Sequence, residues 1–101
     1  MKVLLTPRAE SQLAELPVPA ARRVVSALRI LEGAPRSGRP YPEDSPFRGL
    51  FYKTVVVKAR RWSYRVTYGI EGDAVWIYYL YPSWYPATHP GLAGRRPDEE
   101  D

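Results

Sequence analysis

Five cationic side chains fall on or between two neighbouring predicted strands in the middle of this 101-residue sequence. They are Lys53, Lys58, Arg60, Arg61 and Arg65. Lysine ammonium and arginine guanidinium groups can hold a phosphodiester and stabilise the negative charge that develops on it during a reaction. A group of this kind suits an RNA ligand, and Arg65 stands out because it lies at the centre of a predicted strand.

Three further candidates follow the last predicted strand: Trp84, Tyr85 and His89. An exposed aromatic ring such as that of Trp84 can stack on an unpaired base. His89 is the only histidine, and imidazole has the one unperturbed pKa suited to proton transfer near neutrality. These residues could therefore complement the cationic group.

Each candidate also has a purely structural interpretation. The cations of the predicted turn can be ordinary solvated charges, and the aromatic residues after the last strand can simply cover the sheet edge. His89, flanked by Pro90, can be incidental. Arg65 is harder to explain in this way, because a strand-centre cation that faces away from the core requires an exposed sheet face.

Metal and cofactor chemistry has no support in the sequence. Cysteine is absent, and no acidic cluster is spaced to join His89 in binding a metal ion. No glycine-rich phosphate loop is present either. We therefore expect neither a metal site nor a cofactor.

The residues around Arg65 alternate with the period of a strand that is buried on one face. Trp62, Tyr64, Val66, Tyr68 and Ile70 share one parity, whereas the polar residues between them share the other. Strands are predicted over residues 50–57, 62–70 and 74–81. Because residues 58–61 and 71–73 make only short connections, these strands form an antiparallel meander.

The first third of the chain predicts two helices. Thr6 followed by Pro7 is a helix-start signal, and leucines recur at helical spacing over residues 7–16 and 20–31. Two short amphipathic helices must bury their apolar stripe against the sheet. We expect an α+β fold with a short N-terminal strand (residues 2–6) and a helical hairpin packed on one face of an antiparallel sheet. The proline-rich residues 34–49 are expected to be a connection, which leaves the Arg65 face uncovered.

Length and charge set the wider limits. The chain is long enough for one core, so we expect a single domain over residues 1–90 and a flexible acidic tail over residues 91–101. The net charge is +4, yet residues 95–101 hold two of the 15 Lys and Arg residues and four of the 11 Asp and Glu residues. Residues 1–94 are therefore more basic than the whole chain, which favours an anionic partner. Nothing resembles a signal peptide or membrane span, so a cytoplasmic location without membrane association is the default.

The order of elements and several residues resemble the RelE/ParE toxin superfamily of bacterial toxin–antitoxin modules. The resemblance covers roughly residues 3–85. It includes the helical hairpin, the loop that ends in residues 47–50, the strand opened by Tyr52 and Lys53, and the block Tyr64-Arg65-Val66-Thr67-Tyr68. That block is its most specific part.

The resemblance implies a RelE-like fold and a toxin of a type II toxin–antitoxin system. RelE-like members are mRNA endoribonucleases (mRNA interferases) that cleave mRNA on the ribosome by 2′-hydroxyl attack. It further implies that Lys53 and Arg65 hold the phosphate, that Tyr85 or His89 assists proton transfer, and that a cognate antitoxin covers the basic surface.

Two alternatives stay open within the same family. RNA-cleaving relatives usually carry another arginine just after the final strand, where this chain has Pro82, Ser83 and Trp84. The chain can instead be a ParE-like, non-enzymatic inhibitor of DNA gyrase. It can also be a degenerate member that binds only an antitoxin or nucleic acid.

Overall fold

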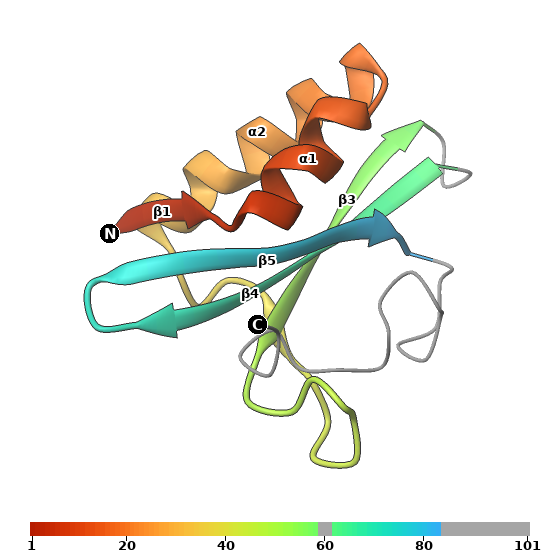
Figure 1. The fold of residues 1–101 in the computed structure, drawn as a ribbon. Coiled ribbons are helices and arrows are strands. Elements are labelled where there is room, and N and C mark those ends of the chain that lie inside the picture. The colour runs from red at the N-terminus through yellow and green to blue at the C-terminus, as the bar shows by residue number, and fades with distance from the viewer. Residues whose placement is uncertain (59–61, 84–101) are drawn as a thin grey trace.

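A computed structural model describes residues 1–58 and 62–83 of the chain. Its elements follow in the order β1 (Lys2–Leu5), α1 (Pro7–Glu15), α2 (Val18–Gly33), β2 (Arg39–Pro40), β3 (Phe51–Lys58), β4 (Trp62–Glu71) and β5 (Ala74–Pro82). Both helices lie on one side of a single sheet (Figure 1). The predicted α+β architecture, with a short first strand and a helical hairpin on one face, is confirmed.

The sheet has five strands in the order β1-β5-β4-β3-β2. Strand β1 pairs with β5 in parallel, and the other neighbours are antiparallel. The predicted meander thus forms the centre of the sheet, with β4 between β3 and β5. Strand β2, which pairs only Arg39 with Tyr52 and Pro40 with Phe51, was not predicted.

Local sequence explains where the helices begin. The hydroxyl oxygen of Thr6 accepts a hydrogen bond from the Ala9 amide at 3.2 Å and caps α1, with Pro7 in the first turn. Helix α2 begins at Val18, slightly before the predicted start. Proline is tolerated in a first helical turn because the amides there have no partner within the helix. Pro17 and Pro19 therefore start α2 as well as separate it from α1. Within the described ranges, no helix is long and apolar enough to cross a membrane.

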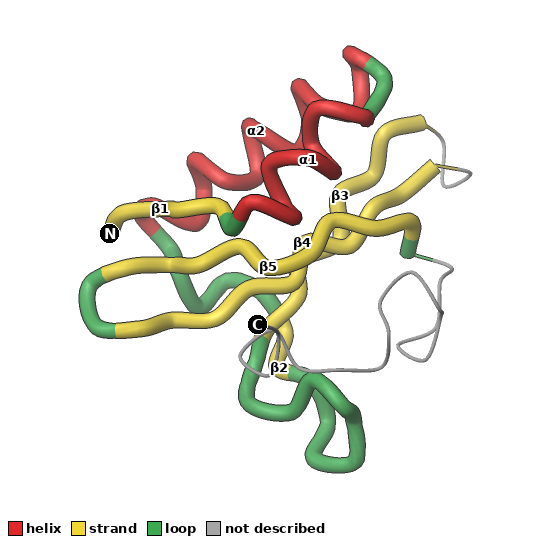
Figure 2. The backbone as a smooth tube through the Cα atoms, in the orientation of Figure 1, coloured by secondary structure: helices red, strands yellow, loops and turns green. Residues whose placement is uncertain are grey.

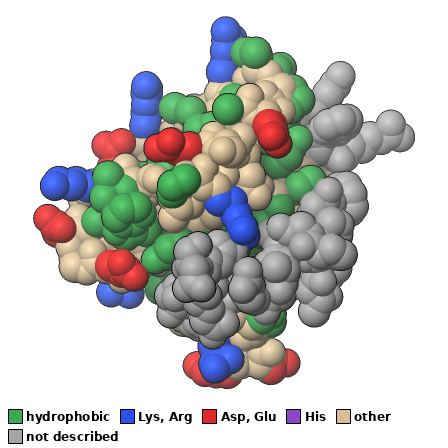
Figure 3. All heavy atoms as spheres, viewed as in Figure 1, with side chains coloured by type: hydrophobic (Ala, Val, Ile, Leu, Met, Phe, Trp, Pro, Cys, Tyr) green, Lys and Arg blue, Asp and Glu red, His purple; other side chains and the backbone are tan. Residues whose placement is uncertain are grey.

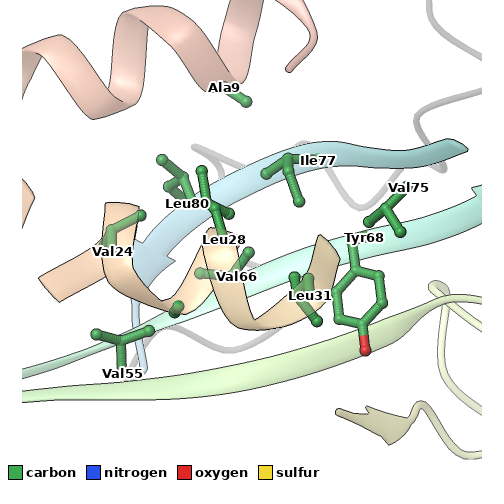
Figure 4. Packing of buried hydrophobic residues seen from close by; sticks show 11 residues of the cluster. Ala9, Val24, Leu28, Leu31, Val55, Val66, Tyr68, Val75, Ile77 and Leu80 are labelled. Atoms are coloured by element: carbon green, nitrogen blue, oxygen red, sulfur yellow. The ribbon is translucent and has the colours of Figure 1, made fainter. Parts of the chain in front are cut away.

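The main core lies between the helices and the sheet (Figure 4). Buried side chains of α1 and α2 meet one face of β3, β4 and β5 there. They are Ala9, Val24, Ala27, Leu28 and Leu31 from the helices, and Val55, Val66, Tyr68, Val75, Ile77 and Leu80 from the strands. Leu28 and Leu31 of the hairpin are thus buried as expected, and Leu13 and Leu16 are partly buried against the same core.

The opposite face of the sheet, which was expected to be uncovered, is partly covered. The segment between β2 and β3 leaves the sheet on the side away from the helices (Figure 2). Its Tyr41, Phe47 and Leu50 form a second buried cluster with Tyr79 and Tyr81 of β5. The prediction was wrong here because the proline-rich stretch was interpreted as a connection only, although its aromatic side chains need a surface on which to pack.

A bulge in β5 determines which tyrosines reach this second cluster. Thr67 pairs with Tyr79 whereas Tyr68 pairs with Ile77, so Tyr78 is the extra residue. An extra residue reverses the alternation of side chains along a strand. Tyr79 and Tyr81 consequently face the same side as Arg65, and Leu80 faces the helices together with Ile77.

Candidate anion-binding cleft

Arg65 lies in the middle of β4, on the face away from the helices. Its direct neighbours across the sheet are Thr54 on β3 and Tyr81 on β5. The guanidinium carbon is 4.3 Å from the centroid of the Tyr52 ring, which is a cation–π distance. The Nε atom is shielded from solvent and has no hydrogen-bond partner among the described residues. The Tyr52 ring thus positions this side chain, which lines a cleft.

A cleft of about 340 Å³ opens beside this arginine at the edge of the sheet. Residues of the α2–β2 connection, β2, β3 and β4 line it: Ser37, Gly38, Arg39, Tyr52, Lys53, Thr54 and Arg65. Three of these described residues are cationic and none is acidic. Like charges held close together repel one another, so this arrangement favours an anion that neutralises them.

Lys53 reaches the cleft from the other side of the sheet. It pairs with Val66 and lies two residues before Val55, so it shares a face of the sheet with these two core residues. Its Nζ donates a hydrogen bond to the hydroxyl of Ser37 at 3.2 Å. Lys53 and Arg65 therefore leave opposite faces of the sheet, and the cleft joins them around the edge of β3.

A network of tyrosine hydroxyls supports the Arg65 side of the cleft. The hydroxyl of Tyr41 is 2.7 Å from that of Thr67 and 2.8 Å from that of Tyr81, and all three residues are buried. The Tyr41 ring packs against Tyr52, with centroids 4.9 Å apart. Because the Tyr52 ring packs against the guanidinium of Arg65, the network supports the ring that positions this cation.

The hydroxyl of Tyr41 is a poor candidate for proton transfer near neutrality. Burial raises the pKa of Tyr41 well above its ordinary value of 10.0, the hydrogen bond to Thr67 opposes the rise, and the hydrogen bond to Tyr81 adds to it. The phenol of Tyr41 consequently keeps its proton at neutral pH. It serves as a structural donor and acceptor.

The predicted site residues fall into two groups. Lys53 and Arg65 line the same cleft, and Lys58 ends β3. The side chain of Lys58 lies outside the described part of the structure. So do all of Arg60, Arg61, Trp84, Tyr85 and His89, together with the predicted domain boundary at residue 90 and the acidic tail. Their roles stay predictions.

Several residues of the cleft were not predicted from the sequence. Ser37 and Arg39 belong to the stretch that was interpreted as a connection. Tyr52 was noted only as the start of a strand, yet it shares a parity with Thr54, the direct partner of Arg65. Strand register could have placed Tyr52 beside Arg65, because diagonal neighbours in a sheet are within reach of long side chains.

A second, larger groove of about 630 Å³ runs along the two helices. Apolar and basic side chains line it: Leu13, Ala14, Leu16, Val18, Ala21, Arg22, Val25, Ser26 and Arg29. Val18 is 63% exposed and Val25 is 38% exposed. In one view of the surface, hydrophobic and basic side chains lie next to one another over the helical layer (Figure 3). Exposed valines beside arginines are typical of an interaction surface.

Comparison with solved structures finds the same fold in two bacterial proteins. A structure described as the chromosomal ParDE TA system from P. aeruginosa superposes with a TM-score of 0.59 at 17% identity, over 81% of this chain and 95% of that one. The YoeB/ParE toxin from Agrobacterium tumefaciens superposes with a TM-score of 0.59 at 15% identity, over 83% of this chain and all of that one. No family model matches the sequence. No curated protein matches it closely either. The predicted resemblance to RelE/ParE toxins is confirmed as a likeness of fold.

Proposed function

We propose that this chain, which has the RelE/ParE-type fold, is the toxin of a type II toxin–antitoxin module and acts in the cytoplasm. The observation that carries the proposal is the cleft in which Arg39, Lys53 and Arg65 converge without an acidic neighbour among its described lining. Such a site fits the phosphate backbone of a nucleic acid. The fold match to two toxin–antitoxin structures supports the same assignment.

The activity that we favour is RelE-like cleavage of mRNA on the ribosome. In this reaction the ribose 2′-oxygen forms a bond to the neighbouring phosphorus, and the bond from phosphorus to the 5′-oxygen breaks. Arg65 and Lys53 would stabilise the charge on the phosphate oxygens. Tyr85 or His89 would transfer the proton from the 2′-hydroxyl or to the 5′-oxygen. Additional contacts to the RNA would come from Lys58, Arg60, Arg61 and Trp84.

Inhibition of DNA gyrase without catalysis is the second candidate. One of the two matching structures is a ParDE system, and the described lining of the cleft includes no histidine, aspartate or glutamate. An anionic surface of a protein would then occupy the cleft in place of RNA. A degenerate toxin that binds only its antitoxin or nucleic acid is the third candidate, since it needs the cations but no proton donor.

A cognate antitoxin is the expected partner in each case. The helical groove offers it an apolar floor, with Arg22 and Arg29 beside the exposed Val18 and Val25. An amphipathic helix whose polar side is acidic would complement this surface in both polarity and charge. We therefore assign the helical groove to an acidic helix of the antitoxin.

Controlled expression in bacteria, with mapping of mRNA 5′ ends and of plasmid supercoiling, separates the candidates. A ribonuclease gives growth arrest and new mRNA ends within coding regions, and supercoiling stays normal. A gyrase inhibitor gives relaxed plasmid and intact mRNA. Unchanged growth with the wild-type chain would contradict both toxin activities and leave the degenerate member. Arg65→Ala should abolish arrest, whereas Arg23→Ala, which alters an exposed arginine of α2 outside both clefts, should not.

A further inference from the structure

The ring of Tyr68 lies in the main core, but its hydroxyl makes two hydrogen bonds to residues outside that core. The ring is fully buried in the main core and stacks on Phe51, with centroids 5.6 Å apart. The hydroxyl reaches out of the core to the connection between α2 and β2. It donates to the carbonyl oxygen of Pro35 at 2.8 Å and accepts from the amide of Gly38 at 3.0 Å.

Residues 35–38, which we call the arm, form one wall of the anion-binding cleft. Ser37 accepts the hydrogen bond from Lys53 Nζ, and Gly38 leads directly into Arg39. The position of the arm therefore affects where Lys53 and Arg39 lie in the cleft. The phenol of Tyr68 binds the first and last residues of the arm, in addition to the backbone hydrogen bond from Ser37 to Ala34 and the pairing of Arg39 with Tyr52.

Gly38 lies so close to the sheet that a side chain has no room there. A methyl group at this position would come within 2.5 Å of the Tyr68 hydroxyl oxygen and 2.6 Å of the Tyr52 carbonyl oxygen. Close contact of the backbone with Tyr68 and β3 thus requires glycine. Burial also raises the pKa of Tyr68, with the hydrogen bond from Gly38 opposing the rise, so the phenol stays protonated and can donate to Pro35.

We infer that Tyr68 is a positioning residue of the anion-binding cleft: its hydroxyl holds the arm against β3 and so presets Lys53, Ser37 and Arg39 for one phosphate group. The inference rests on the proposed role of the cleft in binding phosphate. Cations that repel one another keep a binding geometry only if the backbone around them is fixed before the anion arrives. Tyr68 does so without touching the ligand.

The test measures binding of inorganic pyrophosphate by the full chain with isothermal titration calorimetry. Tyr68→Phe keeps the buried ring and removes only the hydroxyl. We expect it to weaken pyrophosphate binding about three- to tenfold, the range that corresponds to loss of one or two hydrogen bonds. Tyr78→Phe is the matched control, because the hydroxyl of Tyr78 bonds to Glu71 at the β4–β5 turn. Its affinity should equal that of the wild type.

If Tyr68 served only the stability of the fold, Tyr68→Phe would have a lower melting temperature than the wild type. The folded variant would still bind pyrophosphate with the affinity of the wild type. A double-mutant cycle with Gly38→Ala gives a second readout. The cost of Gly38→Ala to binding should be smaller in the Tyr68→Phe background, since the arm is already released there. Additive costs, or an unchanged affinity in Tyr68→Phe, would overturn the inference.

Three further outcomes are decisive. If Tyr68→Phe does not fold, Gly38→Ala alone must weaken pyrophosphate binding, and a folded Gly38→Ala variant with wild-type affinity rejects the inference. If the wild type does not bind pyrophosphate, the cleft is no phosphate site and the inference fails. Pyrophosphate binding by a chain that neither arrests growth nor cleaves mRNA would instead refute the toxin proposal and leave the role of Tyr68 intact.

Discussion

Arg65 and Tyr52 form a cation–π pair across two strands, with 4.3 Å between the guanidinium carbon and the ring centroid. They are diagonal neighbours, because the direct partner of Arg65 is Thr54. The ring covers one face of the guanidinium and makes no hydrogen bond to it. Arg65 is consequently held in place at the lining of the cleft.

Removing the Tyr52 ring should loosen Arg65. We expect Tyr52→Leu to weaken binding of a short single-stranded RNA about two- to fivefold, which corresponds to about 0.5–1 kcal/mol for a partly exposed cation–π pair. Tyr52→Phe keeps the ring and should bind almost as tightly as the wild type. Fluorescence anisotropy at one fixed salt concentration measures both, since salt alone changes such affinities. Equal losses in the two variants would mean that the hydroxyl, and not the ring, matters.

Alkaline pH should destabilise the protein partly through Tyr41. Its pKa is raised in the folded state, mainly by burial, so above about pH 10 the unfolded chain loses the phenolic proton first. The unfolded state then binds fewer protons than the folded state, and the free energy of unfolding falls as pH rises. Below pH 10 both states are protonated and this contribution is fully present.

Tyr41→Phe tests this linkage through urea unfolding between pH 8 and about pH 11. At pH 8 the variant should be less stable by about 1–3 kcal/mol, because the hydroxyls of Thr67 and Tyr81 lose their shared partner. Above about pH 10 its stability should decline less steeply than that of the wild type. Parallel pH profiles of the two proteins would show that Tyr41 does not titrate on unfolding.

The sheet and the helices were predictable because their periodicities are strong. Apolar alternation in β4 placed Val66 and Tyr68 in the main core, and helical spacing placed Leu28 and Leu31 there. The positions of two side chains on the far face were not predictable by the same rule. Tyr79 and Tyr81 reach it only because of the bulge at Tyr78, which no periodic pattern indicates.

The candidate site was predictable only in part. Arg65 was found from its position in the strand, and Lys53 from its charge and family resemblance. The sequence alone did not show that the two leave opposite faces and meet at a sheet edge. That geometry depends on the arm and on β2, whose short pairing comes from tertiary contacts such as those of Tyr68 and Gly38.

Two adjacent residues of α2 test the layering of the fold. Leu31 is fully buried between α2 and the sheet, whereas Ile30 is 52% exposed. Leu31→Ala should lower the free energy of unfolding by about 2–5 kcal/mol, because it removes buried contacts and leaves a cavity. Ile30→Ala should cost less than about 1 kcal/mol. Chemical denaturation measures both, and similar costs would contradict the position of α2 on the sheet.

A mutation in the helical groove should weaken antitoxin binding without changing the activity that we assign to the anion-binding cleft. We expect Val25→Glu to weaken binding of the acidic antitoxin at least tenfold, since it places a like charge on the apolar floor. Ile30→Glu introduces the same charge on α2 outside the groove and should have little effect. Calorimetry with the purified antitoxin gives the affinities. Val25→Glu should also keep the growth arrest that we expect of the wild type, and loss of arrest would show that the groove serves toxicity itself.

The most direct test of the account is cleavage of mRNA by the purified chain on programmed ribosomes. We predict that the wild type cleaves the mRNA and that Arg65→Ala lowers the cleavage rate about 10²- to 10³-fold, as expected for loss of one group that stabilises developing charge. Arg23→Ala should cleave at the wild-type rate. Absence of cleavage by the wild type, or equal rates for the wild type and Arg65→Ala, would contradict the claim that this cleft is the active site of a ribonuclease.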